Sequence, residues 1–182
     1  MKIEKTPLEG LLVITPQIFT DERGWFLESY NQARFENAGM PCRFVQDNHS
    51  RSGRGTLRGL HYQSQPGQVK LVRCTHGEVW DVAVDIRPGS PTFGQWWGSE
   101  LNPQAGKQLY IPIGFAHGFL VLSEWAEVQY KCSWFYEAKT ECGIRWNDPD
   151  LAVAWPLQGV SPLLSRRDQE TPLFRQAFPQ TA

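Results

Sequence analysis

Residues 106–119 read GKQLYIPIGFAHGF, with glycine and proline on either side of short apolar runs and a single histidine, His117, near the end. The glycines predict tight turns, because glycine adopts backbone conformations that other residues avoid. Turn-forming residues recur along the whole chain, where 16 Gly and 13 Pro interrupt short apolar runs. This pattern predicts an all-β sandwich or barrel, rather than strands that alternate with long helices.

Length and composition limit the kind of protein. A chain of 182 residues predicts a single domain, residues 1–182, that buries a core without disulfides or metal. Its 18 Lys and Arg balance 19 Asp and Glu, so its charge indicates neither nucleic acid nor an anionic membrane as a partner. The apolar run 11–14 is too short for a signal core or a membrane span, which predicts a cytoplasmic protein. The cysteines form no Cys-x-x-Cys pair and are expected to be reduced intracellular thiols: Cys42, Cys74, Cys132 and Cys142.

Three segments have a clear local pattern. Residues 68–74 and 79–86 predict two antiparallel strands joined as a hairpin at His76 and Gly77. One face of the second strand carries Trp80, Val82, Val84 and Ile86, and the other carries Asp81, Ala83 and Asp85. Residues 31–39 predict a short helix that Gly39 ends in a left-handed conformation.

The stretch 56–63, TLRGLHYQ, contains the first candidate for chemistry. His61 has a side chain suited to moving protons near neutral pH, and Arg58 can hold a carboxylate or phosphate through paired hydrogen bonds. The alternative is a packed histidine with a structural hydrogen bond. Asp168 has a similar alternative, because Ser165–Asp168 also reads as a capping box whose acidic side chain bonds back to a free backbone amide.

Other polar residues leave the same choice open. Arg23 and Glu28 are candidates for a polar site or are solvated turn charges. The segment 46–50, which is dense in hydrogen-bonding groups, suits ligand recognition or ordinary turn chemistry. Tyr130 shares its strand face with apolar neighbours, so it is either a core residue with a satisfied hydroxyl group or a residue that borders a cavity.

The opening stretch also matches a known signature. A glycine, five residues, Pro-x-Gly, two residues and His117 resemble the second signature of the cupin barrels, in which the histidine faces the interior. Val121 stands where an asparagine is usual. The first cupin signature supplies a His-x-His pair and a Glu, whereas residues 61–63 contain one histidine, so the usual metal set is absent. The resemblance implies a cupin-type double-stranded β-helix, or jelly-roll barrel, with a few short peripheral helices.

Taken together, nine segments resemble the dTDP-4-dehydrorhamnose 3,5-epimerases, small cupin enzymes of nucleotide-sugar metabolism. The match covers almost the whole chain, and the nine segments follow the family's order: residues 21–28, 46–50, 57–63, 70–73, 84–87, 114–119, 130–132, 147–151 and 164–168. The resemblance implies inversion of C3 and C5 of dTDP-4-keto-6-deoxy-D-glucose to give dTDP-4-keto-L-rhamnose, without a cofactor or a metal.

Proton chemistry beside a ketone requires a base, a partner for the enolate oxygen and an acid on the opposite face of the ring. By resemblance, His61 is the base and Asp168 orients its imidazole. Lys70 helps to hold the enolate oxygen, and Tyr130 returns the proton.

The resemblance also implies a set of substrate contacts. No glycine-rich phosphate loop is present, so arginines meet the pyrophosphate, and Arg167 stands where the family often has lysine. The binding positions implied are Arg23, Arg58 and Arg167 for the pyrophosphate, Gln46 and Asn48 for the nucleotide, Glu28 and Glu141 for other ligand contacts, Tyr136 for stacking on thymine, and His117 near the sugar. The family forms homodimers with exchanged strands, so Arg23 and Glu28 are expected to complete the neighbour's site.

Three other functions remain open at this point. The first is epimerisation of a single carbon, C3 or C5, of a related dTDP-keto-deoxysugar. The second is a metal-dependent cupin oxygenase with ligands among the four histidines, His49, His61, His76 and His117. The third is a sugar-nucleotide binding module without catalysis.

Overall fold

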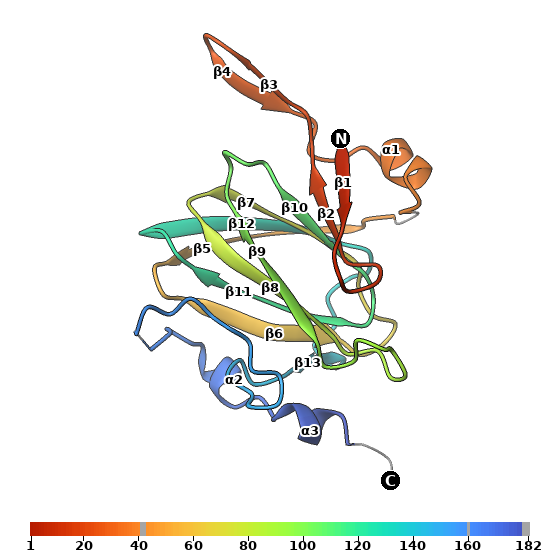
Figure 1. Ribbon diagram of the computed structural model, residues 1–182, viewed down its shortest axis with the longest axis vertical. Coiled ribbons are helices and arrows are strands. Elements are labelled where there is room, and N and C mark those ends of the chain that lie inside the picture. Colours follow the sequence, from red (N-terminus) through yellow and green to blue (C-terminus); the bar gives the residue numbers. More distant parts are fainter. Residues whose placement is uncertain (41–42, 160, 180–182) are drawn as a thin grey trace.

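Two antiparallel sheets face each other in the computed structural model, which describes residues 1–40, 43–159 and 161–179 (Figure 1). The larger sheet has the strand order β1 (Lys2–Lys5), β2 (Leu12–Thr15), β10 (Gln108–Ile111), β7 (Lys70–His76), β12 (Trp125–Cys132) and β5 (Gln46–Gly53). The smaller sheet has the order β13 (Glu141–Gly143), β6 (Leu57–Gln63), β11 (Phe115–Val121), β8 (Val79–Asp85) and β9 (Trp96–Leu101).

The arrangement is the predicted all-β, cupin-type jelly roll. Its helices are short and peripheral: α1 (Gln32–Asn37), α2 (Arg166–Gln169) and α3 (Phe174–Ala177). Helix α1 confirms the helix expected over 31–39, since Asn31 caps its start and Gly39 follows its end with φ of 81°. No helix in the described part of the chain is long and apolar enough to cross a membrane.

The predicted hairpin at His76 and Gly77 is wrong. Strand β7 pairs with β10 and β12, whereas β8 pairs with β11 and β9, so the turn carries the chain from one sheet to the other. Gly77 has φ of 71°, and a Cβ atom there would lie 2.1 Å from the carbonyl oxygen of Trp125. Alternation along a strand shows which side chains share a face, but it does not choose the neighbouring strand.

Apolar side chains fill the space between the sheets and also cover the outer face of each. The inner core joins Val72 of β7, Leu109 of β10 and Phe119 of β11, with Tyr130 packed against it. The predicted apolar face of β8 points outwards, where the C-terminal segment covers it with Trp155 and other residues. Cys74, Cys132 and Cys142 are free thiols, and Cys42 lies outside the described residues.

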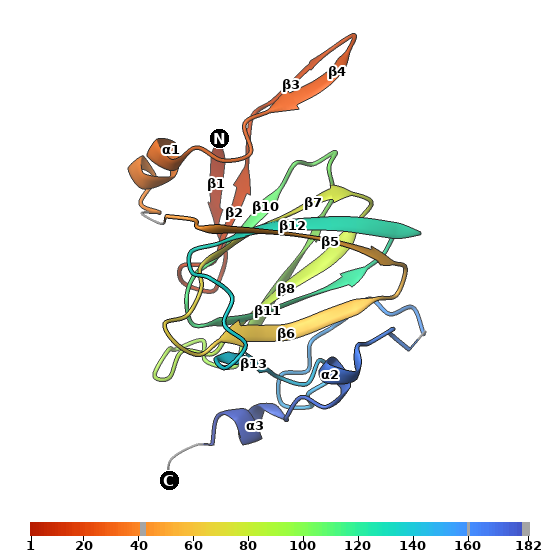
Figure 2. The same cartoon turned by 180° about the vertical axis from the view of Figure 1, so that it is seen from behind.

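A two-stranded hairpin, β3 (Ile18–Asp21) and β4 (Gly24–Leu27), projects from the barrel at the end opposite α2 and α3 (Figures 1 and 2). Its aromatic side chains are open to solvent: Phe19 is 54% exposed, Trp25 59% and Phe26 69%. Exposed aromatic residues on an arm of this kind usually mark an interaction surface. The hairpin also carries Arg23 at its turn.

Asp85, at the end of β8, is expected to make the fold acid-sensitive. Burial alone would raise the pKa of its carboxyl, but hydrogen bonds from Arg87, Ser90 and Thr92 outweigh burial and lower the pKa. The stability from this group is present above the unfolded carboxyl pKa of about 4 and is lost as pH falls towards the lowered value. Asp85→Asn should cost roughly 2–4 kcal/mol at pH 7 and flatten the decline of stability below pH about 4. Urea unfolding of both proteins at several pH values checks this; parallel pH curves would contradict it.

Candidate active site

A cavity of about 700 Å³ lies between the two sheets and is bordered by the segment 163–168. Strands β5, β7 and β12 of the larger sheet contribute to its wall, as do β6 and β11 of the smaller sheet. Eight of the predicted site residues line it: Arg58, His61, Lys70, His117, Tyr130, Glu141, Arg167 and Asp168. The chain therefore brings most of the candidate residues together around one space.

His61 and Asp168, 107 residues apart in sequence, form a direct pair. The Nε2 atom of His61 lies 2.5 Å from Oδ1 of Asp168, and the Asp168 side chain is 4% exposed. Burial alone would raise the pKa of the Asp168 carboxyl, but hydrogen bonds from His61, Ser165 and the Gly59 backbone lower it. An ionised carboxylate only accepts hydrogen bonds, so Nε2 carries the proton and Nδ1 is the basic nitrogen of a neutral His61.

The alternative reading of Asp168 is partly correct. Ser165 does cap α2, because its side chain accepts a hydrogen bond from the backbone amide of Asp168 at 3.1 Å. The Asp168 carboxylate, however, does not bond back to the Ser165 amide in the expected way. It accepts from the Ser165 hydroxyl group at 2.8 Å and from His61. The helix cap and the histidine pair therefore share the same residues.

A second histidine pair lies beside the first. His117 of β11 is the cross-strand neighbour of His61, and its Nε2 atom lies 2.9 Å from both carboxylate oxygens of the fully buried Asp81. The two strands approach closely because Gly59 has no side chain. Its φ is 114°, and a Cβ atom there would lie 2.6 Å from the backbone of His117 and of Gly118.

Lys70 and Tyr130 come from the opposite sheet, on β7 and β12. Within the described part of the chain, neither the Lys70 ammonium group nor the Tyr130 hydroxyl group makes a hydrogen bond or ion pair. Burial lowers the pKa of Lys70, while Cys132, Glu141 and Asp81 oppose that shift. Burial also raises the pKa of Tyr130, so its hydroxyl group keeps its proton to higher pH than usual. The satisfied hydroxyl group expected of an ordinary core tyrosine is not observed.

Polar groups at the cavity wall are linked to one another. The guanidinium group of Arg58 donates to Ser52 at 3.1 Å. Glu141 accepts from the Tyr136 hydroxyl group at 2.5 Å and pairs with Arg167. Gln46, on β5, joins the same network, since its Oε1 atom accepts from the Tyr136 backbone amide at 2.8 Å. Tyr136 is nevertheless 52% exposed.

Arg23 and Glu28 are not brought to this cavity within the chain. Arg23 pairs with Asp21 at the hairpin turn, and Glu28 pairs with Arg34 of α1 at 3.2 Å. The hairpin points away from the end of the barrel that holds α2 (Figure 2). Neither residue therefore lines the cavity that holds His61.

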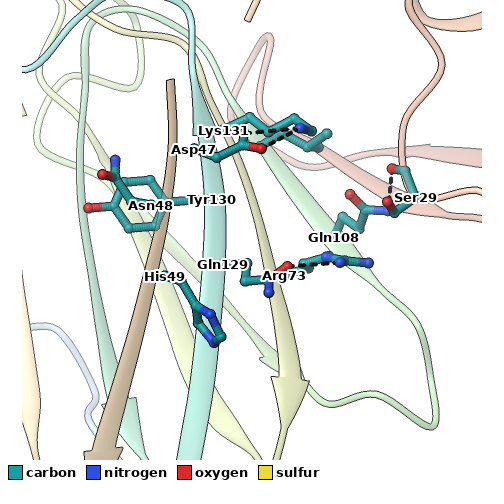
Figure 3. Close-up of a pocket in the computed structure, with 10 residues that line it drawn as sticks. Ser29, Asp47, Asn48, His49, Arg73, Gln108, Gln129, Tyr130 and Lys131 are labelled. Carbon is teal, nitrogen blue, oxygen red and sulfur yellow. Dashed lines mark hydrogen bonds and ion pairs between the residues drawn. The ribbon is translucent and has the colours of Figure 1, made fainter. Parts of the chain in front are cut away.

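A smaller pocket of about 220 Å³ involves the outer face of the larger sheet (Figure 3). Tyr130 and Asn48 project to one side of the strands, whereas Lys131 and Arg73 project to the other (Figure 3). The charged and amide groups on that outer side are already paired, for example Lys131 with Asp47 at 2.9 Å and Arg73 with Gln129 at 2.8 Å. Strand alternation thus separates this pocket from the cavity that holds His61.

The four histidines do not converge on one point. His49 pairs with Glu127 at 3.2 Å, and the ring of His76 stacks on Trp125 at 3.5 Å. Only His61 and His117 line the cavity. Among residues 1–40, 43–159 and 161–179, no group of three or more His, Cys, Asp or Glu side chains is arranged to hold a metal ion. The ligand set considered for a metal-dependent oxygenase is therefore not assembled.

Comparison with known proteins decides the family. A model of the family described as dTDP-4-dehydrorhamnose 3,5-epimerase matches residues 5–176. The chain belongs to this epimerase family. A Pseudomonas aeruginosa dTDP-4-dehydrorhamnose 3,5-epimerase is 54% identical over 178 residues, covering 97% of this chain and 98% of the relative. As a member of the epimerase family, the chain is an isomerase.

Two further relatives show the range of the epimerase family. The crystal structure of a Legionella pneumophila Philadelphia 1 3,5-epimerase in complex with dTDP-4-keto-L-rhamnose is 52% identical, with a TM-score of 0.92 and coverage of 94% of this chain and 92% of that one. A Streptomyces niveus dTDP-4-dehydrorhamnose 3-epimerase is 42% identical, covering 97% of this chain and 86% of the relative. Relatives at this level of identity therefore include a protein named as a 3-epimerase as well as proteins named as 3,5-epimerases.

Two residues of the site were not recognised from sequence. The alternation of residues 79–86 places Asp81 on the second face of its strand but does not indicate that its partner is His117. The pattern around Ser165 indicates a helix cap and no other role. In both cases the missing information was the position of a histidine on another strand, which the local pattern does not contain.

Proposed function

We propose that this chain is a dTDP-4-dehydrorhamnose 3,5-epimerase, which inverts C3 and C5 of dTDP-4-keto-6-deoxy-D-glucose without a cofactor. The observation that carries the proposal is the position of the base and the acid on opposite walls of one cavity. His61 belongs to β6 of the smaller sheet, and Tyr130 belongs to β12 of the larger sheet. Inversion needs proton removal from one ring face and proton return to the other, and this arrangement suits both steps.

In the proposed reaction, Nδ1 of His61 removes the proton beside the ketone and the bonding electrons pass to the ketone oxygen. The charge of Asp168 stabilises the imidazolium ion that forms. Lys70, whose ammonium group makes no hydrogen bond or ion pair among the described residues, is available to hold the enolate oxygen, and His117 of the smaller sheet lines the same cavity. Tyr130 then gives its proton to the carbon from the opposite face. The His61 imidazolium releases its proton to solvent, and the tyrosinate takes one up, which restores both groups.

The remaining residues suit the nucleotide end of the substrate. Arg58 and Arg167 line the same cavity and offer planar donor groups for the pyrophosphate. Tyr136 presents an exposed ring for stacking on thymine, held by Glu141 and Gln46. Asn48, which is also held by Gln46 at 3.0 Å, contributes to the nucleotide contacts.

Hydrogen exchange in deuterated water tests the reaction directly. The purified chain is incubated with dTDP-4-keto-6-deoxy-D-glucose, and the product is analysed by proton NMR. The proposal expects deuterium at both C3 and C5. Deuterium at one carbon alone would assign the chain to the single-carbon epimerases, as the similarity to the Streptomyces niveus protein allows. Binding without exchange at either carbon would indicate a non-catalytic module.

The active form is proposed to be a homodimer with exchanged strands. The β3–β4 hairpin projects from its own barrel with three exposed aromatic residues, which a second copy would cover. In such a dimer, Arg23 and Glu28 reach the ligand bound by the neighbour. Each complete site would then combine Arg23 of one chain with His61 of the other.

Mixing two impaired variants tests this sharing of residues. Arg23→Ala should lower kcat/KM about 10- to 100-fold through loss of a pyrophosphate contact, and His61→Asn removes the base. A refolded 1:1 mixture should recover about a quarter of the wild-type activity, because half of the dimers are mixed and each has one complete site. A mixture no more active than the sum of its separate components would contradict the shared site.

A further inference from the structure

Ser165 makes a reciprocal contact with Asp168. Its hydroxyl group donates to Oδ2 of the carboxylate at 2.8 Å and accepts from the Asp168 backbone amide at 3.1 Å. The other carboxylate oxygen, Oδ1, faces His61. Ser165 therefore holds both the backbone and the carboxylate of the residue that orients the histidine.

The support for Asp168 comes from a very short element. Helix α2 has four residues, so its own backbone bonds position Asp168 weakly. The carboxylate is held by three separate groups: the Ser165 hydroxyl, the backbone amide of Gly59 and His61 itself. Of these, only the serine hydroxyl belongs to a side chain that the proposed reaction does not already use. Ser165 also lines the cavity that is proposed to hold the substrate.

We propose that Ser165 is a positioning residue for proton abstraction. Ser165, Asp168 and His61 form a chain of hydrogen bonds in which the serine hydroxyl keeps Oδ1 of Asp168 directed at His61. This inference rests on the proposed epimerase reaction. The serine transfers no proton to the substrate; it restricts rotation of the carboxylate and so fixes the orientation of Nδ1 of His61. Loss of the hydroxyl group should therefore slow the chemical step more than it weakens substrate binding.

Four forms of the protein separate this role from helix capping. Serine, threonine and glycine are all accepted at the N-cap, whereas alanine is not. Threonine keeps the hydroxyl donor, while glycine and alanine lack it. Ser165→Gly thus removes the donor with little loss of capping, Ser165→Ala removes both, and Ser165→Thr keeps both.

We expect kcat to depend on whether residue 165 has a hydroxyl donor and not on how well it caps the helix. Ser165→Gly and Ser165→Ala should each lower kcat about 5- to 20-fold with KM within about twofold, and Ser165→Thr should stay within about threefold of wild type. Burial and the His61 contact remain in these variants, so loss of the serine donor should raise the pKa of the Asp168 carboxyl. Carbon-13 NMR of that carboxyl group, assigned with an Asp168→Asn variant, measures this shift.

The two proposals fail in different ways. If Ser165→Gly keeps the wild-type kcat and carboxyl pKa while Ser165→Ala only melts at a lower temperature, Ser165 is a helix cap and its positioning role is excluded. If wild-type protein itself incorporates no deuterium into the dTDP-sugar, the proposed reaction is wrong. Substrate-binding measurements on all four forms complete the test, because an equal rise in KM and fall in kcat would also contradict a positioning role.

Discussion

Replacing His61 by asparagine is expected to lower kcat about 10³-fold or more and to abolish deuterium incorporation at both carbons. Asparagine is polar and smaller than histidine, so it fits the site, but its amide nitrogen takes the position of Nδ1 and does not reach Asp168, which contacts Nε2 of His61. It has no nitrogen that can accept a proton near neutral pH. The substrate should therefore still bind, and the change should fall on kcat much more than on KM.

The matched control for this substitution is His76→Asn. His76 stacks on Trp125 at the end of β7 and does not line the cavity. Its replacement should leave kcat within about twofold of wild type. Deuterium exchange that continues at the wild-type rate in His61→Asn would show that another group is the base. It would also contradict the proposed role of Asp168 in orienting His61.

Replacing Tyr130 by phenylalanine should separate proton removal from inversion. His61 and the groups that hold the enolate oxygen remain, so the enolate still forms and can take deuterium back from the His61 side. The acid on the opposite wall is lost, so inversion should slow about 10²- to 10³-fold. The expected product is therefore starting sugar that carries deuterium without a change of configuration.

Proton NMR of the sugar after incubation in deuterated water distinguishes the outcomes, since it reports both the label and the configuration. Phenylalanine fills the same space among the inner-core residues that pack around Tyr130, so the thermal stability should change little. Inversion at the wild-type rate would remove Tyr130 from the mechanism. Loss of exchange together with inversion would instead mean that Tyr130 is needed to form the enolate.

Much of the fold is predictable because it depends on local patterns. Pro112 and Gly114 separate β10 from β11, and the two faces of residues 79–86 are those of β8. The local pattern does not show which strands pair with one another. The error at Gly77 arose because a tight turn can join two strands of one sheet or carry the chain between sheets. That choice depends on contacts between distant residues, such as the pairing of β7 with β12.

For the candidate site too, one part is predictable from sequence and another part is not. The types of residue that serve proton transfer and anion binding were visible in sequence, and family resemblance connected them. Their geometry was not visible. The sequence allows Asp168 to be part of a helix cap or a partner of His61, and in the structure both apply, because Ser165 caps the helix and also donates to the Asp168 carboxylate.

The sequence by itself determined the all-β class, the faces of the strands, the membership of an epimerase family and the candidate residues, since each depends on residue order along the chain. The tertiary structure alone decided which strands are neighbours and which side chains meet. It brought Asp168 to His61 and Asp81 to His117, and it put Lys70 and Tyr130 on the wall opposite the histidines. It also kept Arg23 and Glu28 away from that cavity. The physical reason is that packing two sheets around one core positions residues by contacts across the barrel, which local sequence does not encode.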